Sequence, residues 1–234
     1  MSIRRPPVEP NINRRQILKN SFFVGASGIA AVAGVAGIAR AEELCNTNGT
    51  TPAQTEGPFY PITAHADLDA DLTILKGQTE RARGEVVDLW VRVQDENCQP
   101  IAGALVDLWQ ACATGKYDHP NDPNEADVDP LFQYWAKVHT NSKGYVKLRT
   151  IKPGAYPADD TWYRPPHIHF KVSGEGFQEL TTQMYFAGEA LNKKDLILLN
   201  MPVMDRSKVT VRFTRSTAQA LPTGIFTVTL KGLV

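Results

Sequence analysis

Two histidines with one apolar residue between them are the side chains of this sequence most able to bind a metal. They stand in His167-Ile168-His169, inside the strand-like run 166–172. Successive side chains of a strand point to opposite faces, so both imidazoles should share one face and Ile168 should lie on the other. Two imidazoles placed in this way can share one metal ion. The pattern alone slightly favours a structural interpretation, because the same spacing occurs in strands where both rings only form hydrogen bonds.

Two tyrosines extend this candidate site. Tyr117 follows an expected strand at a short distance, and Tyr156 lies in the turn 153–157, upstream of the histidines. A free phenol has a pKa of about 10, so it binds as phenolate at neutral pH only to a strongly Lewis-acidic ion. Two phenols with two imidazoles therefore suit Fe(III) better than Zn²⁺ or Fe²⁺. Taken singly, each tyrosine is more often a half-buried ring whose hydroxyl bonds to a neighbour.

Alternating apolar residues predict the strands that must position these side chains. The chain has 16 prolines and 17 glycines, which oppose long helices. We predict an all-β fold, an antiparallel β-sandwich of about eight strands with long loops and little helix. Only 189–199 looks weakly helical, and 118–130 is expected to be a long loop. The predicted strands are 87–93, 104–108, 145–149, 167–172, 180–186, 209–214 and 225–231.

The first 41 residues have the three parts of an export signal. A pair of arginines, Arg14-Arg15, is followed by the uncharged, glycine-rich stretch 20–39 and then by Ala39-Arg40-Ala41. This order resembles a twin-arginine signal, which predicts export of a folded protein to the periplasm or the medium. We expect cleavage after Ala41 and no membrane association afterwards. The alternative is an uncleaved anchor, since 20 uncharged residues can just span a bilayer.

Residues 42–234 are expected to form one domain. They carry 19 basic and 24 acidic side chains, so they lack the basic face that nucleic-acid binding requires. Cys98 and Cys112 flank a predicted strand and should not pair with each other. Cys45 could reach either of them, which would leave the third as a buried free thiol. The sequence does not choose between these pairings.

Six ordered motifs resemble the intradiol ring-cleaving dioxygenases, non-haem iron enzymes that open catechols between the two hydroxylated carbons. The likeness spans about residues 52–200 and is nearer the protocatechuate type. It implies that Tyr117, Tyr156, His167 and His169 bind Fe(III), and that Tyr156 is the ligand that the incoming substrate replaces. The motifs are Thr-Glu-Gly-Pro-Phe-Tyr at 55–60, Gly-Ala-Leu-Val-Asp-Leu-Trp-Gln at 103–110, Gly-Lys-Tyr at 115–117, Thr-Ile-Lys-Pro-Gly-Ala-Tyr-Pro at 150–157, Arg-Pro-Pro-His-Ile-His-Phe at 164–170 and Gln-Met-Tyr-Phe at 183–186.

The resemblance further implies two residues beside the substrate ring, Arg164 and Gln183. Arg164 would stabilise developing negative charge by cationic hydrogen bonding, and its alternative role is a structural salt bridge. Gln183 lies on a predicted strand whose alternate positions face the sandwich interior, and its alternative role is a hydrogen-bonded core amide. Trp109 and Trp162 could line the pocket, but a Trp on a sandwich strand is more often core, so both stay outside the catalytic set.

The implied reaction joins a catechol-type substrate with O2 and gives a muconate-type dicarboxylic acid. Two features depart from the family pattern: Ala158 follows Pro157 where protocatechuate-type members usually have a bulky aromatic residue, and the spacing from Tyr156 to His167 is shorter. Both fall where the substrate ring would lie, so the sequence does not identify which catechol is the substrate. The sequence is compatible with a homo-oligomer.

The alternative function is an exported, transthyretin-like binding or structural module without catalysis. Metal content separates the two hypotheses, because a ferric tyrosinate centre should colour the purified protein red-brown. Exchange of Tyr117 or Tyr156 for Phe should weaken or abolish that colour.

Overall fold

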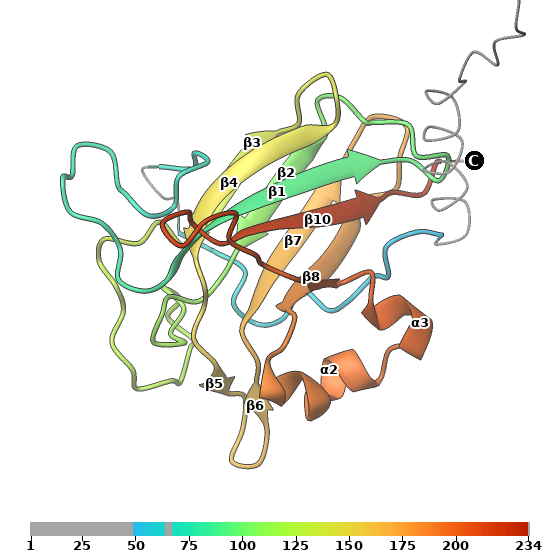
Figure 1. Cartoon of the computed structure of the whole chain (residues 1–234). Coiled ribbons are helices and arrows are strands. Elements are labelled where there is room, and N and C mark those ends of the chain that lie inside the picture. Colours follow the sequence, from blue (N-terminus) through green and yellow to red (C-terminus); the bar gives the residue numbers. More distant parts are fainter. Residues whose placement is uncertain (1–48, 64–66, 234) are drawn as a thin grey trace, which may run out of the picture.

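The computed structural model describes residues 49–63 and 67–233 of the 234-residue chain. Figure 1 shows these residues folded around two facing sheets. The strands are β1 (Val86–Gln94), β2 (Leu105–Trp109), β3 (Trp135–His139), β4 (Tyr145–Ile151), β5 (Tyr156–Pro157), β6 (Tyr163–Arg164), β7 (His167–Ser173), β8 (Leu180–Phe186), β9 (Thr210–Val211) and β10 (Thr223–Thr229). The helices are short: η1 (Ala190–Lys193), α2 (Leu196–Leu199) and α3 (Val203–Arg206).

One sheet has the strand order β10-β1-β4, and the other has the order β3-β2-β7-β8-β9. A separate two-stranded hairpin, β5-β6, lies below them beside α2 (Figure 1). The predicted all-β sandwich with long loops and little helix is confirmed. Two strand pairs, β1 with β10 and β8 with β9, are parallel, and the other pairs are antiparallel.

The core lies between the two large sheets and follows from the alternation in the sequence. On β1, Leu89, Val91 and Val93 are fully buried and face the second sheet. Phe170 of β7 packs against Phe226 of β10 with ring centroids 5.0 Å apart. Burial of a large apolar side chain contributes on the order of 1.5–3 kcal/mol. These contacts therefore fix which face of each strand is turned inward.

The predicted elements differ from the structure in several places. Strand β3 and the β5-β6 hairpin were not predicted, and the strand expected at 209–214 is reduced to β9. The weak helix expected at 189–199 is divided into η1 and α2, because Asp195 has an extended backbone and its side chain accepts a hydrogen bond from Leu198 N as the N-cap of α2. The loop expected at 118–130 contains no helix or strand.

Cys98 is disulfide-bonded, and Cys112 is a buried free thiol. The prediction that these two do not pair with each other is confirmed. Cys45 and the predicted export signal at 1–41 lie outside the described residues. Within the part of the chain that is described, none of the helices has the length and apolar character needed to cross a membrane.

Candidate metal centre and active-site cleft

The two histidines begin strand β7, which lies between β2 and β8. Ile168 packs into the core between the sheets, so His167 and His169 point from the opposite face, as their spacing predicts. The register places His169 between Trp109 of β2 and Gln183 of β8, in one row across the sheet. The Trp109 ring stacks on the His169 ring with centroids 4.9 Å apart and planes 12° apart. This row fixes the orientation of His169.

The segment 51–60 crosses this outer face of the sheet and covers it. Gln54 N donates to Thr181 O at 2.9 Å, and the Gln54 side chain donates to Gln183 O at 2.8 Å. In return, Gln183 Nε2 donates to Thr55 O at 2.9 Å. The histidines are therefore buried even though they lie outside the core between the sheets.

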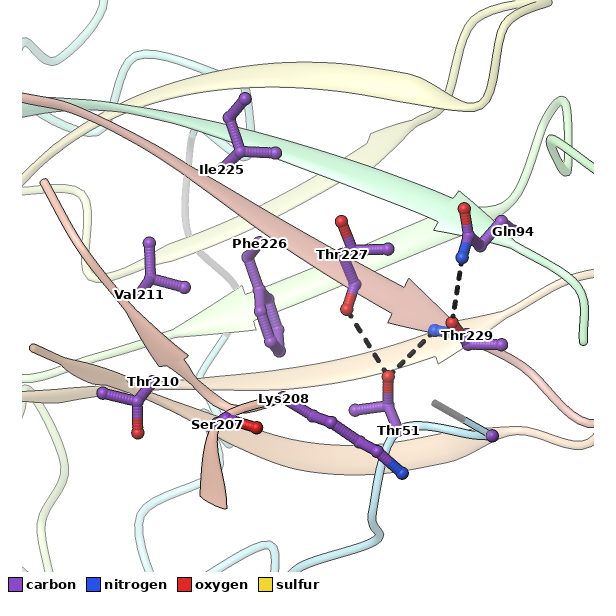
Figure 2. Close-up of a pocket in the computed structure, with 11 residues that line it drawn as sticks. Thr51, Gln94, Ser207, Lys208, Thr210, Val211, Ile225, Phe226, Thr227 and Thr229 are labelled. Carbon is purple, nitrogen blue, oxygen red and sulfur yellow. Dashed lines mark hydrogen bonds between the residues drawn. The ribbon is translucent and has the colours of Figure 1, made fainter. Parts of the chain in front are cut away.

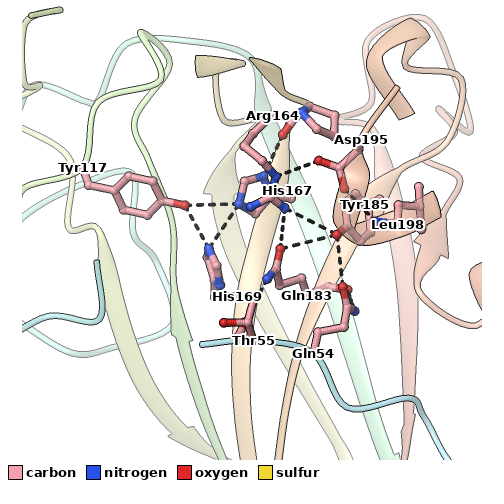
Figure 3. A network of polar contacts seen from close by, with 11 residues as sticks. Gln54, Thr55, Tyr117, Arg164, His167, His169, Gln183, Tyr185, Asp195 and Leu198 are labelled. Atoms are coloured by element: carbon pink, nitrogen blue, oxygen red, sulfur yellow. Dashed lines mark hydrogen bonds and ion pairs between the residues drawn. The ribbon is translucent and has the colours of Figure 1, made fainter. Parts of the chain in front are cut away.

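Three of the predicted ligand atoms converge on one point (Figure 3). The hydroxyl oxygen of Tyr117 lies 3.1 Å from Nε2 of His169 and 3.4 Å from Nε2 of His167, and the two Nε2 atoms lie 3.1 Å apart. A metal with bonds of about 2.1 Å, at angles between a right angle and a tetrahedral one, separates its donor atoms by about 3.0–3.4 Å. The three atoms thus have the mutual distances of ligands to a single ion.

The surroundings of the two imidazoles favour the neutral form that binds a metal through Nε2. Nδ1 of His167 lies 2.7 Å from Pro165 O and must donate to it, so Nε2 carries the lone pair that faces His169 and Tyr117. Burial lowers the pKa of His167 well below its usual range and that of His169 to about 3, with the charge of Arg164 adding to both effects. Both rings are therefore neutral at pH 7, which is the form that binds metal.

The two tyrosines are buried phenols whose ionisation requires a cation. Burial raises the pKa of Tyr117 well above its usual range, and it also raises the pKa of Tyr156, against which the charge of Arg164 acts. The two rings meet edge to face with centroids 5.6 Å apart, and the Tyr156 ring lies 5.6 Å from that of His167. Tyr156 therefore borders the point where the other three side chains meet.

One backbone carbonyl connects the segments that carry the two tyrosines. Cys112 O accepts hydrogen bonds from Gly115 N and from Gly154 N, each at 3.0 Å. Gly115 precedes Tyr117 by two residues, and Gly154 precedes Tyr156 by two residues. The two phenols therefore come from turns that are bonded to the same atom.

Gly115→Ala should separate these turns. Gly115 has φ +85°, and a Cβ there would lie 2.5 Å from Ala155 O and 3.1 Å from Tyr156 Cβ. We expect a loss of unfolding free energy of at least ~1 kcal/mol together with weaker Fe(III) binding. Gly144→Ala is the matched control, because Gly144 has φ +73° and its Cβ would lie 2.5 Å from Val93 O, in the turn between β3 and β4. Urea unfolding and iron titration of both variants check this; equal iron affinity in the two would contradict it.

Arg164 lies beside the candidate centre, on the short strand β6 that pairs with β5. The register places it opposite Tyr156. Its Nε donates to Asp195 Oδ2 at 2.7 Å and its Nη2 donates to Gln183 Oε1 at 2.6 Å. Side-chain exposure is 6% for Arg164 and 0% for Asp195, so the predicted alternative, a structural salt bridge, is present. The bonds to Nε and Nη2 leave Nη1 available to a substrate.

Gln183 faces the histidines and not the core between the two sheets. The residue of β8 that points into the sandwich interior is Met184, which pairs with Ile168, whereas Gln183 pairs with His169 on the outer face. Its amide bonds to Arg164 on one side and to Thr55 on the other. These contacts give Gln183 a positioning role toward Arg164; contact with substrate stays a prediction.

Sequence reasoning missed three residues of this network. Asp195 pairs with Arg164, and the hydroxyl of Tyr185 donates to Gln54 Oε1 at 3.0 Å and lies 3.4 Å from Arg164 Nη2. Tyr185 stands in the motif at 183–186, and Gln54 directly precedes the motif at 55–60, so their positions were available as a signal. Asp195 has no such signal, because its partner is distant in sequence and its neighbours form only a short helix.

A cleft of about 370 Å³ opens beside Tyr156 and Arg164. This volume lies within the range of small-molecule sites. Its walls come from four segments: 55–59 of the covering segment, Pro123 of the loop 118–130, the β5-β6 hairpin, and Ile197 of α2. The cleft is therefore the place from which a small ring can reach the candidate centre.

A second cleft, of about 210 Å³, lies between β9 and β10, which are edge strands of the two large sheets (Figure 2). Threonines and Lys208 supply most of its polar groups. Thr51 and Thr229 bond to each other there, and the Lys208 amine is bonded to Thr50 O and paired with Asp205. Lys208 is the one charged side chain of this lining and is already paired, so this cleft contributes no candidate chemistry.

The donor set of the candidate centre fits Fe(III). Among the described residues, no group of three or more His, Cys, Asp and Glu side chains could hold a metal ion, so the two imidazoles need the phenols to complete a ligand set. Nδ1 of His169 is buried and has no hydrogen-bond partner in the described part of the chain. That atom is left as the protonated nitrogen when Nε2 binds a metal, in agreement with the tautomer of His167.

A family model described as Dioxygenase matches residues 55–231, a range that includes all four candidate ligands and the cleft. The chain belongs to the intradiol ring-cleaving dioxygenase family. It is 37% identical to the protocatechuate 3,4-dioxygenase beta chain of Burkholderia cepacia over 166 aligned residues. The alignment covers 69% of this chain and 70% of that protein. It is 33% identical over 167 residues to catechol 1,2-dioxygenase 2 of Acinetobacter lwoffii, covering 64% of this chain and 56% of that protein.

Solved structures of the family share the fold. The dioxygenase domain of a dioxygenase and carbohydrate-binding fusion from Streptomyces sp. SirexAA-E matches with a TM-score of 0.59 and 28% identity, covering 79% of this chain and 99% of that one. The 3-chlorocatechol 1,2-dioxygenase of Rhodococcus opacus 1CP matches with a TM-score of 0.62 and 24% identity, covering 86% and 79%. The second likeness shows the fold alone.

Proposed function

We propose that this chain is an Fe(III)-dependent intradiol dioxygenase that cleaves the ring of a catechol-type substrate. One O2 is consumed and both of its atoms enter the product, so the muconate-type dicarboxylic acid contains all the atoms of the catechol and two further oxygens. Tyr117, Tyr156, His167 and His169 would hold the iron. The observation that supports this most directly is the convergence of Tyr117 Oη and the two Nε2 atoms at 3.1–3.4 Å.

When bound, Fe(III) supplies the Lewis acidity that lowers the pKa of phenols and catechol hydroxyls and makes the substrate ring reactive toward O2. The protein supplies the remaining functions. Tyr156 borders both the centre and the cleft, so its phenolate oxygen is placed to accept a proton from an incoming catechol hydroxyl. Arg164, held by Asp195 and Gln183, directs a fixed cation at the negative charge that develops on the substrate oxygen.

The experiment that tests this function is oxygen uptake by iron-loaded protein. Catechol, protocatechuate, hydroxyquinol and larger substituted catechols are supplied in turn, and products formed under ¹⁸O2 are identified by mass. We expect a ring-opened diacid that carries two labelled atoms. Full iron occupancy without uptake on any of these compounds would contradict the proposal and favour the binding-module alternative. The relatives from Burkholderia cepacia and Acinetobacter lwoffii are both named as dioxygenases, and neither is named as a binding module.

We also propose that the protein is exported by the twin-arginine route and acts in the periplasm or the medium. The support is the order of the arginine pair, the uncharged stretch and Ala39-Arg40-Ala41 in the sequence. Replacing Arg14 and Arg15 together by Lys should retain the protein in the cytoplasm, as seen by fractionation. Equal export of the parent protein and the double variant would contradict the proposed route.

A further inference from the structure

The β5-β6 hairpin sets the order of groups along the active-site cleft. Tyr156 pairs with Arg164 at the end near the candidate centre. The next residues outward are Pro157 and Ala158, and Ala158 N donates to Trp162 O at 2.8 Å. Asp159 and Asp160 follow at the exposed tip. A substrate whose two hydroxyls face the centre would therefore direct its ring substituent toward Ala158, Trp162 and the tip.

The wall that such a substituent would meet is largely apolar. Arg164 is the one charged side chain that lines the cleft, and it lies at the inner end, where Asp195 balances its charge. The other polar side chains of the lining are Thr55, Trp162 and, at the inner end, Tyr156, and none of them supplies a positive charge. The apolar lining residues are Pro58, Phe59, Pro123, Pro157, Ala158 and Ile197.

The exposed tip of the hairpin, next to Ala158, carries negative charge. Asp159 Oδ1 accepts hydrogen bonds from Thr161 N and Trp162 N, each at 2.8 Å, and the bonds from Thr161 hold the pKa of Asp159 below its usual range. Asp160 adds a second carboxylate beside it. A substituent carboxylate would lose its hydration against apolar walls and would lie near two like charges. The one cation of the lining, Arg164, lies 5.3 Å from the centre of the Trp162 ring and is already paired with the buried Asp195.

We propose that the cleft takes an uncharged catechol that carries an apolar alkyl or aryl substituent, and that it discriminates against catechols that carry a carboxylate. This inference rests on the proposed function and names its substrate class. It assigns a preference different from the one that the name of the Burkholderia cepacia relative, a protocatechuate 3,4-dioxygenase chain, would suggest. The residue that decides it is Ala158, at the position where the sequence departs from the protocatechuate-type pattern.

The test compares kcat/KM of the iron-loaded protein for 4-ethylcatechol and for protocatechuate. We expect the ratio to favour 4-ethylcatechol by at least tenfold, and the preference to persist at high salt because desolvation is not screened. Ala158→Arg places a cation on the outer wall and should reduce the ratio by about tenfold or more. Ala158→Met has similar reach without charge and is the matched control, in which the ratio should not move toward protocatechuate.

A second variant and a binding measurement keep the test decisive. Asp160→Lys places a cation at the exposed tip and replaces Ala158→Arg in the test if that variant does not fold. It should also lower the ratio of kcat/KM for 4-ethylcatechol to that for protocatechuate. Binding of the unreactive 4-ethylphenol and 4-hydroxybenzoate, followed by Trp fluorescence, needs no turnover and should show the same preference. If no catechol is cleaved, the proposed function fails while this binding ratio still decides the inference. A wild-type preference for protocatechuate or 4-hydroxybenzoate would overturn it.

Discussion

The Tyr117→Phe protein is expected to lose much of the red-brown charge-transfer colour and more than ~100-fold of its ring-cleaving activity, since even the loss of a residue that only hydrogen-bonds to a metal ligand costs about 10–100-fold. The hydroxyl of Tyr117 is one of the three atoms that meet at 3.1–3.4 Å, and a phenyl ring leaves only the two imidazoles there. The ring itself is retained, so its packing against Phe59, with centroids 4.9 Å apart, should hold the fold. Visible absorbance per bound iron, iron content and oxygen uptake measure the effect.

Tyr163→Phe is the matched control for this experiment. Tyr163 lies on β6 beside Arg164, but its side chain is 53% exposed and lines neither the cleft nor the centre. Colour, iron content and activity of this variant should equal those of the parent protein. A Tyr117→Phe protein with full colour would place the iron elsewhere and contradict the assigned ligand set.

Asp195→Ala is expected to lower the free energy of unfolding by about 3–5 kcal/mol, because removal of one partner from a buried pair leaves an uncompensated charge. Arg164 would lose its acceptor at Nε, and α2 would lose the N-cap bond from Leu198 N to Asp195 Oδ1. Ring cleavage should fall as well, since Arg164 would no longer be held beside Tyr156. Urea unfolding monitored by circular dichroism gives the stability.

Two further variants test whether the loss of stability comes from the unpaired buried charge of Arg164. The double variant Arg164→Met with Asp195→Leu removes both charges, so it should recover most of the lost stability while remaining inactive. Glu189→Ala breaks the partly exposed pair with Lys152 at 2.7 Å and should cost at most ~1 kcal/mol. An Asp195→Ala protein as stable as the parent would show that the buried pair does not hold the hairpin in place.

The sequence predicted those parts of the site that depend on local periodicity. The spacing of His167 and His169 places both rings on one face, and the structure brings Tyr117 to that face. It did not predict which face that is, because both faces of the five-stranded sheet are covered: one by the other sheet, the other by the segment 51–60. Gln183 lies on a correctly predicted strand, and the structure places it on the face of the histidines, opposite the core between the sheets.

The elements that the sequence did not predict are short, and their positions depend on residues that are distant in the sequence. The β5-β6 hairpin has two residues in each strand, too few for any alternation to be visible. It is positioned instead by the pair between Arg164 and Asp195, which are 31 residues apart in the chain. The roles of the four candidate ligands came from the ordered motifs, since spacing alone left the two tyrosines and the histidine pair with structural alternatives.

The carbonyl of Cys112 that accepts from both Gly115 and Gly154 has a consequence for motion during turnover. Because the backbones behind Tyr117 and Tyr156 each donate a hydrogen bond to the same oxygen, a shift of either backbone away from that oxygen breaks its own hydrogen bond. If a substrate displaces the Tyr156 phenol, as proposed, we therefore expect the movement to occur by rotation about the side-chain χ angles of Tyr156 and not by a shift of its backbone.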